Sequence, residues 1–242
     1  MIISCVKWGD KFTHEHVNRL YKMVSKNFDD EFTFICFTEN GDKLNNNIKV
    51  IPLDLSYDLE NWWWKLLLFK KPSADINLFF DLDVVIQNNI THLKEYAIEN
   101  KLCMIKAYWK PYELSRSHSL FDTNFNSSIL AWKGDLSIIW KSFLKDPEYY
   151  MSKYNGIDSF IDYHHNEKLH FFKQGVAYSR LYGIDENNYW RNVNGTIQPK
   201  YFFEPNYDVC IFNGWRRKTD IDNGNKYFLD NEGYKGFEHY WD

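Results

Sequence analysis

Residues 78–86 read Leu-Phe-Phe-Asp-Leu-Asp-Val-Val-Ile, an apolar run interrupted by two carboxylates. Its aromatic and β-branched residues predict a buried strand, placed at residues 77–86, which is the strongest strand signal in the chain. On an extended chain Asp81 and Asp83 share one face, about 7 Å apart. Two anions inside an apolar strand are costly unless a positive group meets them. A divalent cation, Mg²⁺ or Mn²⁺, is the simplest such group; the alternative is a strand end where both side chains emerge into water.

Apolar runs and helical spacing on either side of this stretch predict further strands and helices. Strands are expected at residues 2–6, 32–37, 48–53, 102–107, 128–132 and 209–212, and helices after Thr13, at residues 61–71 before Pro72, and from Asp135 onward. The alternation over the first 90 residues favours an α/β fold with a Rossmann-type, mostly parallel sheet flanked by helices. Ligands bind such sheets outside the carboxyl ends of the strands. The segments of interest are therefore residues 7–12, 38–40, 81–83 and 212–218.

The length of 242 residues suits a single domain, which we place at residues 1–218. Residues 219–242 are polar and aromatic and contain Asn-Gly, Glu-Gly and Lys-Gly steps, which predicts a C-terminal tail or lid. Residues 108–123 show no periodicity and are expected to form a long loop. We expect this loop and the tail to shape the site for a second substrate.

The composition excludes some classes of partner. A net charge of −4 gives no strongly basic face, which argues against a nucleic-acid-binding protein. No signal peptide is visible, and no window approaches the roughly 18 apolar residues of a transmembrane helix. Aromatic residues make up 19% of the chain, and rings in excess of the core's needs suit stacking on bases or sugars. Isolated cysteines between mostly apolar neighbours predict buried, reduced thiols and a cytoplasmic protein; they are Cys5, Cys36, Cys103 and Cys210.

Two groups of cations accompany the paired carboxylates. Lys65 lies within the apolar residues 62–69, so its ammonium must either extend to water or meet an anion. Because this helix precedes the strand of Asp81, Lys65 could reach the same site and meet a phosphate. Residues 213–218 read Asn-Gly-Trp-Arg-Arg-Lys after a predicted strand. Three cations after a glycine could clamp a diphosphate, and a solvated basic turn is the alternative.

Taken together, these segments resemble a glycosyltransferase of the GT-A fold, over most of the chain. Residues 80–83 (Phe-Asp-Leu-Asp) look like that family's DxD metal motif, and residues 64–66 (Trp-Lys-Leu) like a segment of its small bacterial and glycogenin-like members. Residues 125–130 (Phe-Asn-Ser-Ser-Ile-Leu) are similar to its strand bordering the donor sugar. Residues 211–214 with Lys218 are similar to its Phe-His-Gly-x-x-Lys segment, with the Lys one place later.

The resemblance implies a metal-dependent glycosyltransferase that moves a sugar from a nucleotide-diphosphate donor, with UDP the expected nucleotide, to an unknown acceptor, using Mn²⁺ or Mg²⁺. The implied donor-binding residues are Lys7, Trp8, Phe12, Thr38, Lys65, Asp81, Asn126, Gly214 and Lys218. The implied metal ligands are Asp81, Asp83 and Asn213. Asn213 stands where the family usually has His, which makes Asp208 an alternative ligand. Asp158 is the candidate catalytic carboxylate, and a helix-capping Asp is the other interpretation.

Three further interpretations compete with this one. A phosphohydrolase of the haloacid dehalogenase type also carries Asp-x-Asp after an apolar strand, but its motif usually opens the domain and continues with Gly-Thr. A non-catalytic carbohydrate-binding module suits the aromatic excess, yet it does not require Asp81, Asp83 and Lys65 together. A zinc site is the third, although its residues lack an HxxxH or HExxH pairing; they are Asp162, His164, His165 and His170.

Overall fold

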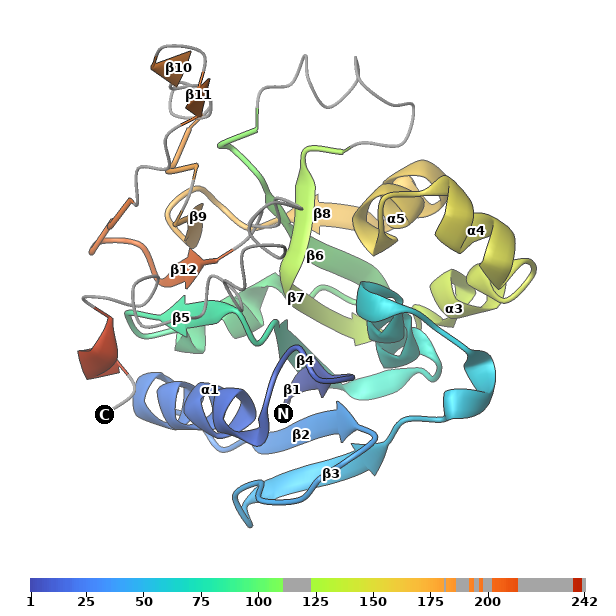
Figure 1. Ribbon diagram of the computed structural model, residues 1–242, viewed down its shortest axis with the longest axis horizontal. Coiled ribbons are helices and arrows are strands. Elements are labelled where there is room, and N and C mark those ends of the chain that lie inside the picture. The colour runs from blue at the N-terminus through green and yellow to red at the C-terminus, as the bar shows by residue number, and fades with distance from the viewer. Residues whose placement is uncertain are drawn as a thin grey trace.

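The computed structural model describes residues 1–110, 123–180, 182–185, 192–193, 196–197, 202–212 and 237–240. Its centre is a seven-stranded sheet in the order β3-β2-β1-β4-β7-β6-β8 (Figure 1). The strands are β1 (Ile2–Lys7), β2 (Thr33–Thr38), β3 (Ile48–Pro52), β4 (Ser73–Phe80), β6 (Lys101–Lys106), β7 (Phe125–Gly134) and β8 (Leu169–Phe171). β7 runs antiparallel to β4 and β6, and the other neighbours are parallel. The predicted α/β fold with a mostly parallel sheet is confirmed.

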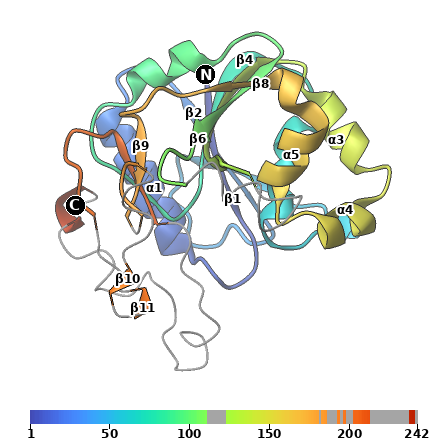
Figure 2. The ribbon, with the colours of Figure 1, turned by 90° about the horizontal axis from the view of Figure 1, so that it is seen from above.

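Helices cover both faces of this sheet, with α1 (His14–Asn27) on one side and α3 (Ser137–Phe143), α4 (Pro147–Lys153) and α5 (Ile157–His165) on the other (Figure 2). Successive residues of a strand point to opposite faces. Leu78 and Phe80 of β4 accordingly pack into the core under α1, whereas Phe79 packs into the core under α3 and α5. Thr13 caps α1, as its position predicted, and its backbone N–H is met in return by His16. Two hydrophobic cores therefore hold β4 in place from both sides.

The segment that carries the two carboxylates departs from the prediction. Residues 77–86 do not form one strand: β4 ends at Phe80, and β5 (Val84–Ile86) belongs to a second sheet with β12 (Val209–Ile211) and β9 (Ala177–Ser179). The reason lies in the backbone hydrogen bonds. The N–H of Asp81 donates to Ser128 O of β7 at 2.9 Å, whereas Asp83 O accepts from the N–H of Phe212 at 2.9 Å. The chain therefore crosses from one sheet to the other at Asp81–Asp83, and the expected shared strand face was wrong.

The apolar segment before β4 is a 3₁₀ helix, η2 (Asn61–Phe69), instead of the ordinary helix expected at residues 61–71. Its ends show the tighter i→i+3 bonding: Trp63 N–H donates to Glu60 O at 3.0 Å, and Lys70 N–H to Leu67 O at 3.1 Å. Side chains three residues apart eclipse one another on such a helix.

The remaining short elements are η1 (Leu55–Tyr57), η3 (Thr91–Tyr96), η4 (Asn166–Lys168), β10 (Asn192–Val193), β11 (Thr196–Ile197) and η6 (Glu238–Tyr240).

The structure describes only part of the predicted C-terminal tail and of the predicted long loop. Residues 213–236, which include the basic turn and most of the expected tail, lie outside the described residues, as do residues 111–122 of the expected loop. Phe237 is buried and packs edge-on against Phe212 at a ring distance of 5.5 Å. Lys26 of α1 donates to His239 O at 3.1 Å. The chain around residues 237–240 therefore contacts α1 and the end of β12.

The four cysteines are free and buried, as predicted. Of the helices that the structure describes, none is both long and apolar enough to cross a bilayer.

Candidate functional site

A cleft of about 520 Å³ opens beyond the carboxyl ends of β1 and β4, where α/β sheets bind their ligands. Several parts of the chain form it: the loop after β1, the first residues of η2, the crossing between β4 and β5, Lys110 after β6, the start of β7, the start of α5, and Phe212 after β12. η2, the cyan helical segment beside α3 in Figure 1, contacts α5. The cleft-lining residues foreseen from the sequence are Trp8, Phe12, Lys65, Asp81, Asp83, Asn126 and Asp158.

Lys65 and Asp81 form an ion pair on the floor of the cleft. The ammonium nitrogen of Lys65 lies 2.7 Å from Asp81 Oδ2, and it donates a second hydrogen bond to Ser127 Oγ at 3.2 Å. The side chain of Lys65 is only 11% exposed. The buried cation that the sequence pointed to therefore meets an anion at this site. Its partner in the structure is the first carboxylate of the motif, and a phosphate entering here would find the same ammonium.

Asp83 points into the same cleft with a different electrostatic environment. Burial is the main cause that raises the pKa of Asp83 to about 6, and repulsion from the Asp81 carboxylate is the second. The positive charges of Lys11 and Lys65 oppose the rise. Two neighbouring carboxylates that repel one another are a suitable oxygen pair for a hard divalent cation, which would relieve the repulsion. The carboxylate oxygens of Asp81 and Asp83 are thus suitable ligands for Mg²⁺ or Mn²⁺.

Within the described residues, no further His, Cys, Asp or Glu side chain joins Asp81 and Asp83 as a metal-binding group. There, no three His, Cys, Asp or Glu side chains gather into a metal-binding group, and this includes the histidines considered for zinc. The predicted third ligand, Asn213, lies outside the described residues together with Gly214 and Lys218. The alternative ligand, Asp208, lies 3.3 Å from His92 Nε2 and is not among the described residues that line the cleft.

Asp158 lies in the first turn of α5, where a negative charge also suits the helix dipole. It lines the cleft, so its carboxylate has a role open to it besides helix capping. Burial raises the pKa of Asp158, and the ammonium of Lys65 and a hydrogen bond with Ser127 oppose that rise. Ser127 therefore stands between the Lys65–Asp81 pair and Asp158.

The loop after β1 brings to the cleft two aromatic residues, Trp8 and Phe12, that the resemblance implied as donor-binding residues. Trp8 packs against Trp64 of η2 with ring centroids 6.4 Å apart, and Phe12 lines the cleft beside it. Lys7 and Thr38 are not among the described cleft-lining residues. The Lys7 ammonium lies 3.5 Å from Glu39 Oε1, which also accepts the N–H of Gly9 at 2.8 Å.

Thr38 makes a turn-closing contact instead: its Oγ1 accepts the N–H of Asn40 at 3.2 Å. Asn126, at the start of β7, does line the cleft, and its Oδ1 accepts the N–H of Ser128 at 3.0 Å.

Several cleft residues were missed when the sequence was considered alone. Lys11, Trp62, Lys110, Ser127 and Gly156 all line the cleft. Lys11 lies inside the segment flagged after the first strand, but nothing in its local pattern separated it from a surface lysine. Trp62 lies three residues before Lys65 and so shares its side of a helix, but nothing in the sequence showed that Trp62, unlike Trp63 and Trp64, is exposed in the cleft.

No protein-family model matches this chain, and no curated protein sequence does either. The fold is nevertheless similar to solved glycosyltransferase structures. The galactosyltransferase LgtC, solved in complex with donor and acceptor sugar analogs, shares 14% identity over 98% of this chain and 99% of its own, with a TM-score of 0.55. GlyE from Streptococcus pneumoniae TIGR4 (10% identity, 74% of this chain and 47% of its own, TM-score 0.52) and the bifunctional WbbM (9%, 74% and 39%, TM-score 0.52) are also similar.

At identities this low, the structural likeness establishes the fold alone. The chain has the GT-A-like glycosyltransferase fold that its sequence motifs resemble. LgtC is matched over almost its whole length, so the likeness takes in the whole fold.

Proposed function

We propose that this protein is a metal-dependent glycosyltransferase that transfers a sugar from a nucleotide-diphosphate donor, with UDP as the nucleotide, to an acceptor. One observation supports this above the others: the Lys65–Asp81 pair, at 2.7 Å, lies beside Asp83 on the floor of a cleft that also holds Asp158. The cation Lys65 and the proposed metal ligands Asp81 and Asp83 thereby share one cleft with a separate carboxylate, Asp158. A diphosphate leaving group needs positive charge from the ammonium and the metal, and a reacting sugar can use the carboxylate of Asp158.

Asp81 and Asp83 are the residues that would hold Mn²⁺ or Mg²⁺. When bound, such a cation supplies Lewis-acid neutralisation of the diphosphate as the glycosidic bond breaks. Lys65 keeps the charge of Asp81 balanced before the donor arrives, and it presents an ammonium to the phosphates afterwards. Lys11, which opposes the raised pKa of Asp83, adds a second positive charge on that side of the cleft.

The rest of the cleft suits the two ends of a nucleotide sugar. Trp8, held by Trp64, and Phe12 offer ring faces for the base. Asn126 and Asp158 offer an amide and a carboxylate for sugar hydroxyls, and Asp158 is the catalytic carboxylate that we propose. The free, buried cysteines fit a reducing compartment, so the cytoplasm remains the proposed location.

Calorimetric binding of UDP with and without Mn²⁺, on the wild type and on Asp83→Ala, tests this function. We expect binding that depends on the metal in the wild type and is lost in the variant, followed by turnover of at least one UDP-sugar. Retained thermal stability of Asp83→Ala shows that the loss is not unfolding. Full activity in a folded Asp83→Ala protein contradicts the metal role.

The same assays separate the two alternative functions. Release of inorganic phosphate from a phosphomonoester, without nucleotide binding, favours the haloacid-dehalogenase type. Binding of a saccharide without any nucleotide binding favours the carbohydrate-binding module.

A further inference from the structure

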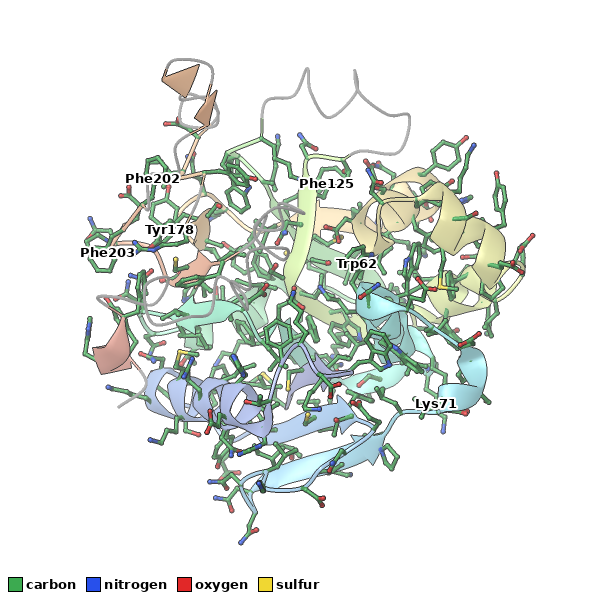
Figure 3. All side chains as sticks on the ribbon, viewed as in Figure 1. Trp62, Lys71, Phe125, Tyr178, Phe202 and Phe203 are labelled. Atoms are coloured by element: carbon green, nitrogen blue, oxygen red, sulfur yellow. The ribbon has the colours of Figure 1, made fainter. Side chains whose placement is uncertain are left out.

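Trp62 is exposed in a way that its neighbours are not. It is 42% exposed, whereas Trp63 and Trp64 next to it are 3% and 1% exposed. It lines the cleft, and Figure 3 labels it at η2, near the start of α5. Leaving a large indole partly in water forgoes the stabilisation that its burial would give. An exposed tryptophan inside a cleft is therefore a candidate contact for a ligand.

The 3₁₀ geometry of η2 places Trp62 on the same side of the helix as Lys65. Residues i and i+3 eclipse on such a helix, with a separation of about 6 Å along the axis. Trp62 thus shares an edge with Lys65, one turn before it, and Lys65 in turn holds Asp81 at 2.7 Å. A molecule lying on Trp62 is consequently one helical turn from the groups proposed to hold the diphosphate.

Gly156, just before α5, packs against the edge of the indole ring of Trp62. A Cβ at position 156 would lie 2.7 Å from Trp62 Nε1, so the ring edge rests directly on the glycine backbone. The φ of Gly156 is +150°, a conformation that other residues rarely adopt. A ring held in this way loses little freedom when a ligand stacks on it.

The groups around Trp62 are suited to a sugar. Asn61, Asn155 and Asp158 line the same part of the cleft and offer amide and carboxylate groups to hydroxyls. Pyranose rings combine such hydroxyls with a face of polarised C–H groups, which packs well on the negative face of an indole. Trp8 and Phe12, in contrast, come from the loop after β1, which also carries the Lys11 that acts on Asp83. The cleft thus has one aromatic wall for a base and a separate one beside Asp158.

Building on the proposed function, we propose that Trp62 is the platform on which the acceptor stacks, and that the acceptor is a saccharide ending in a pyranose with an apolar C–H face. The sugar lies on the indole with its hydroxyls toward Asn61, Asn155 and Asp158. Trp62 then determines which acceptors bind and leaves the donor unaffected.

Saturation-transfer NMR with three probes tests the platform: methyl β-D-galactopyranoside, methyl β-D-glucopyranoside and methyl α-D-mannopyranoside, each with UDP and Mn²⁺ present. We expect Trp62→Ala to weaken binding of at least one glycoside by about tenfold, the order that one aromatic stacking contact contributes, and to leave UDP affinity unchanged. Trp62→Phe keeps a ring and should retain most of the binding. Tyr163→Ala removes a ring that is 68% exposed but does not line the cleft, so it is the matched control.

The remaining outcomes are equally distinct. Unchanged glycoside binding in Trp62→Ala, loss of UDP binding in that variant, or no glycoside binding to the wild type overturns the platform. Glycoside binding that depends on Trp62 in a protein that binds no UDP supports the platform and overturns the proposed transferase instead. Equal melting temperatures for the wild type and Trp62→Ala show that any loss of binding in that variant is not caused by unfolding.

Discussion

The ammonium nitrogen of Lys65 lies 2.7 Å from Asp81 Oδ2, although only 11% and 20% of the two side chains are exposed. The two residues lie on η2 and at the end of β4, and Ser127 of β7 accepts a further hydrogen bond from Lys65. Asp81 is therefore neutralised within the fold. Asp83, two residues later, has its pKa raised to about 6 by burial and by the charge of Asp81. Removing the charge of Asp81 and removing that of Asp83 should therefore change the stability of the protein in different ways.

Replacing Lys65 by Met should lower the free energy of unfolding by about 2 kcal/mol in metal-free buffer. The reason is that breaking a buried ion pair strands its partner at a cost of roughly 3–5 kcal/mol, which the residual exposure of Asp81 reduces. The double variant Lys65→Met/Asp81→Asn should regain much of this loss, because no charge is stranded. Urea unfolding of the wild type, Lys65→Met, Asp81→Asn and the double variant measures the coupling energy between the two residues. Additive effects of the two changes mean that the ion pair contributes nothing to stability.

Asp83→Asn should have opposite effects on stability and on function. It removes a buried charge that Asp81 repels, so the metal-free protein should become more stable, by about 1 kcal/mol. UDP binding in Mn²⁺ should fall at least tenfold. Thermal unfolding and calorimetry check the two effects, with Asp42→Asn, an exposed carboxylate away from the cleft, as the control. A destabilised Asp83→Asn protein would show that Asp83 is compensated by contacts other than a metal.

His16 should make the stability of the protein depend on pH. Its Nδ1 accepts the backbone N–H of Thr13 at 3.1 Å, and burial lowers the pKa of His16 from 6.5 to about 4. The folded state therefore binds fewer protons than the unfolded state between these values, and stability should fall as the pH drops from about 6.5 toward 4. His16→Gln keeps a capping-box residue that does not titrate there, so it should remove this part of the slope. Urea unfolding at several pH values measures it, and an identical slope in both proteins contradicts the role of His16.

The sequence predicted those features that depend on local pattern. Thr13 was recognisable as a cap from its place before an amphipathic helix, and the apolar run before Asp81 from its strand-forming residues. The break at Asp81–Asp83 was not recognisable, because it depends on hydrogen bonds to Ser128 and Phe212, far along the chain. The same limit applies to the site: Asp81 and Asp83 stand out as anions in an apolar run, whereas Trp62 becomes a site residue only through its exposure in the cleft and its contact with Gly156.

Gly156→Ala should reduce saccharide binding without touching any group proposed to hold the donor. The new Cβ would lie 2.7 Å from Trp62 Nε1, so the indole must move, and the φ of +150° adds backbone strain. We expect a loss of stability of about 1–2 kcal/mol, several-fold weaker binding of the glycoside probes, and unchanged UDP affinity. Gly175→Ala is a suitable control, because its φ is also positive, at +106°, but nothing lies within 4 Å of the added Cβ. Strain alone should therefore lower the melting temperature of both variants, and displacement of the indole should weaken glycoside binding only in Gly156→Ala. Equal glycoside binding by the two variants would mean that the position of Trp62 does not matter for the acceptor.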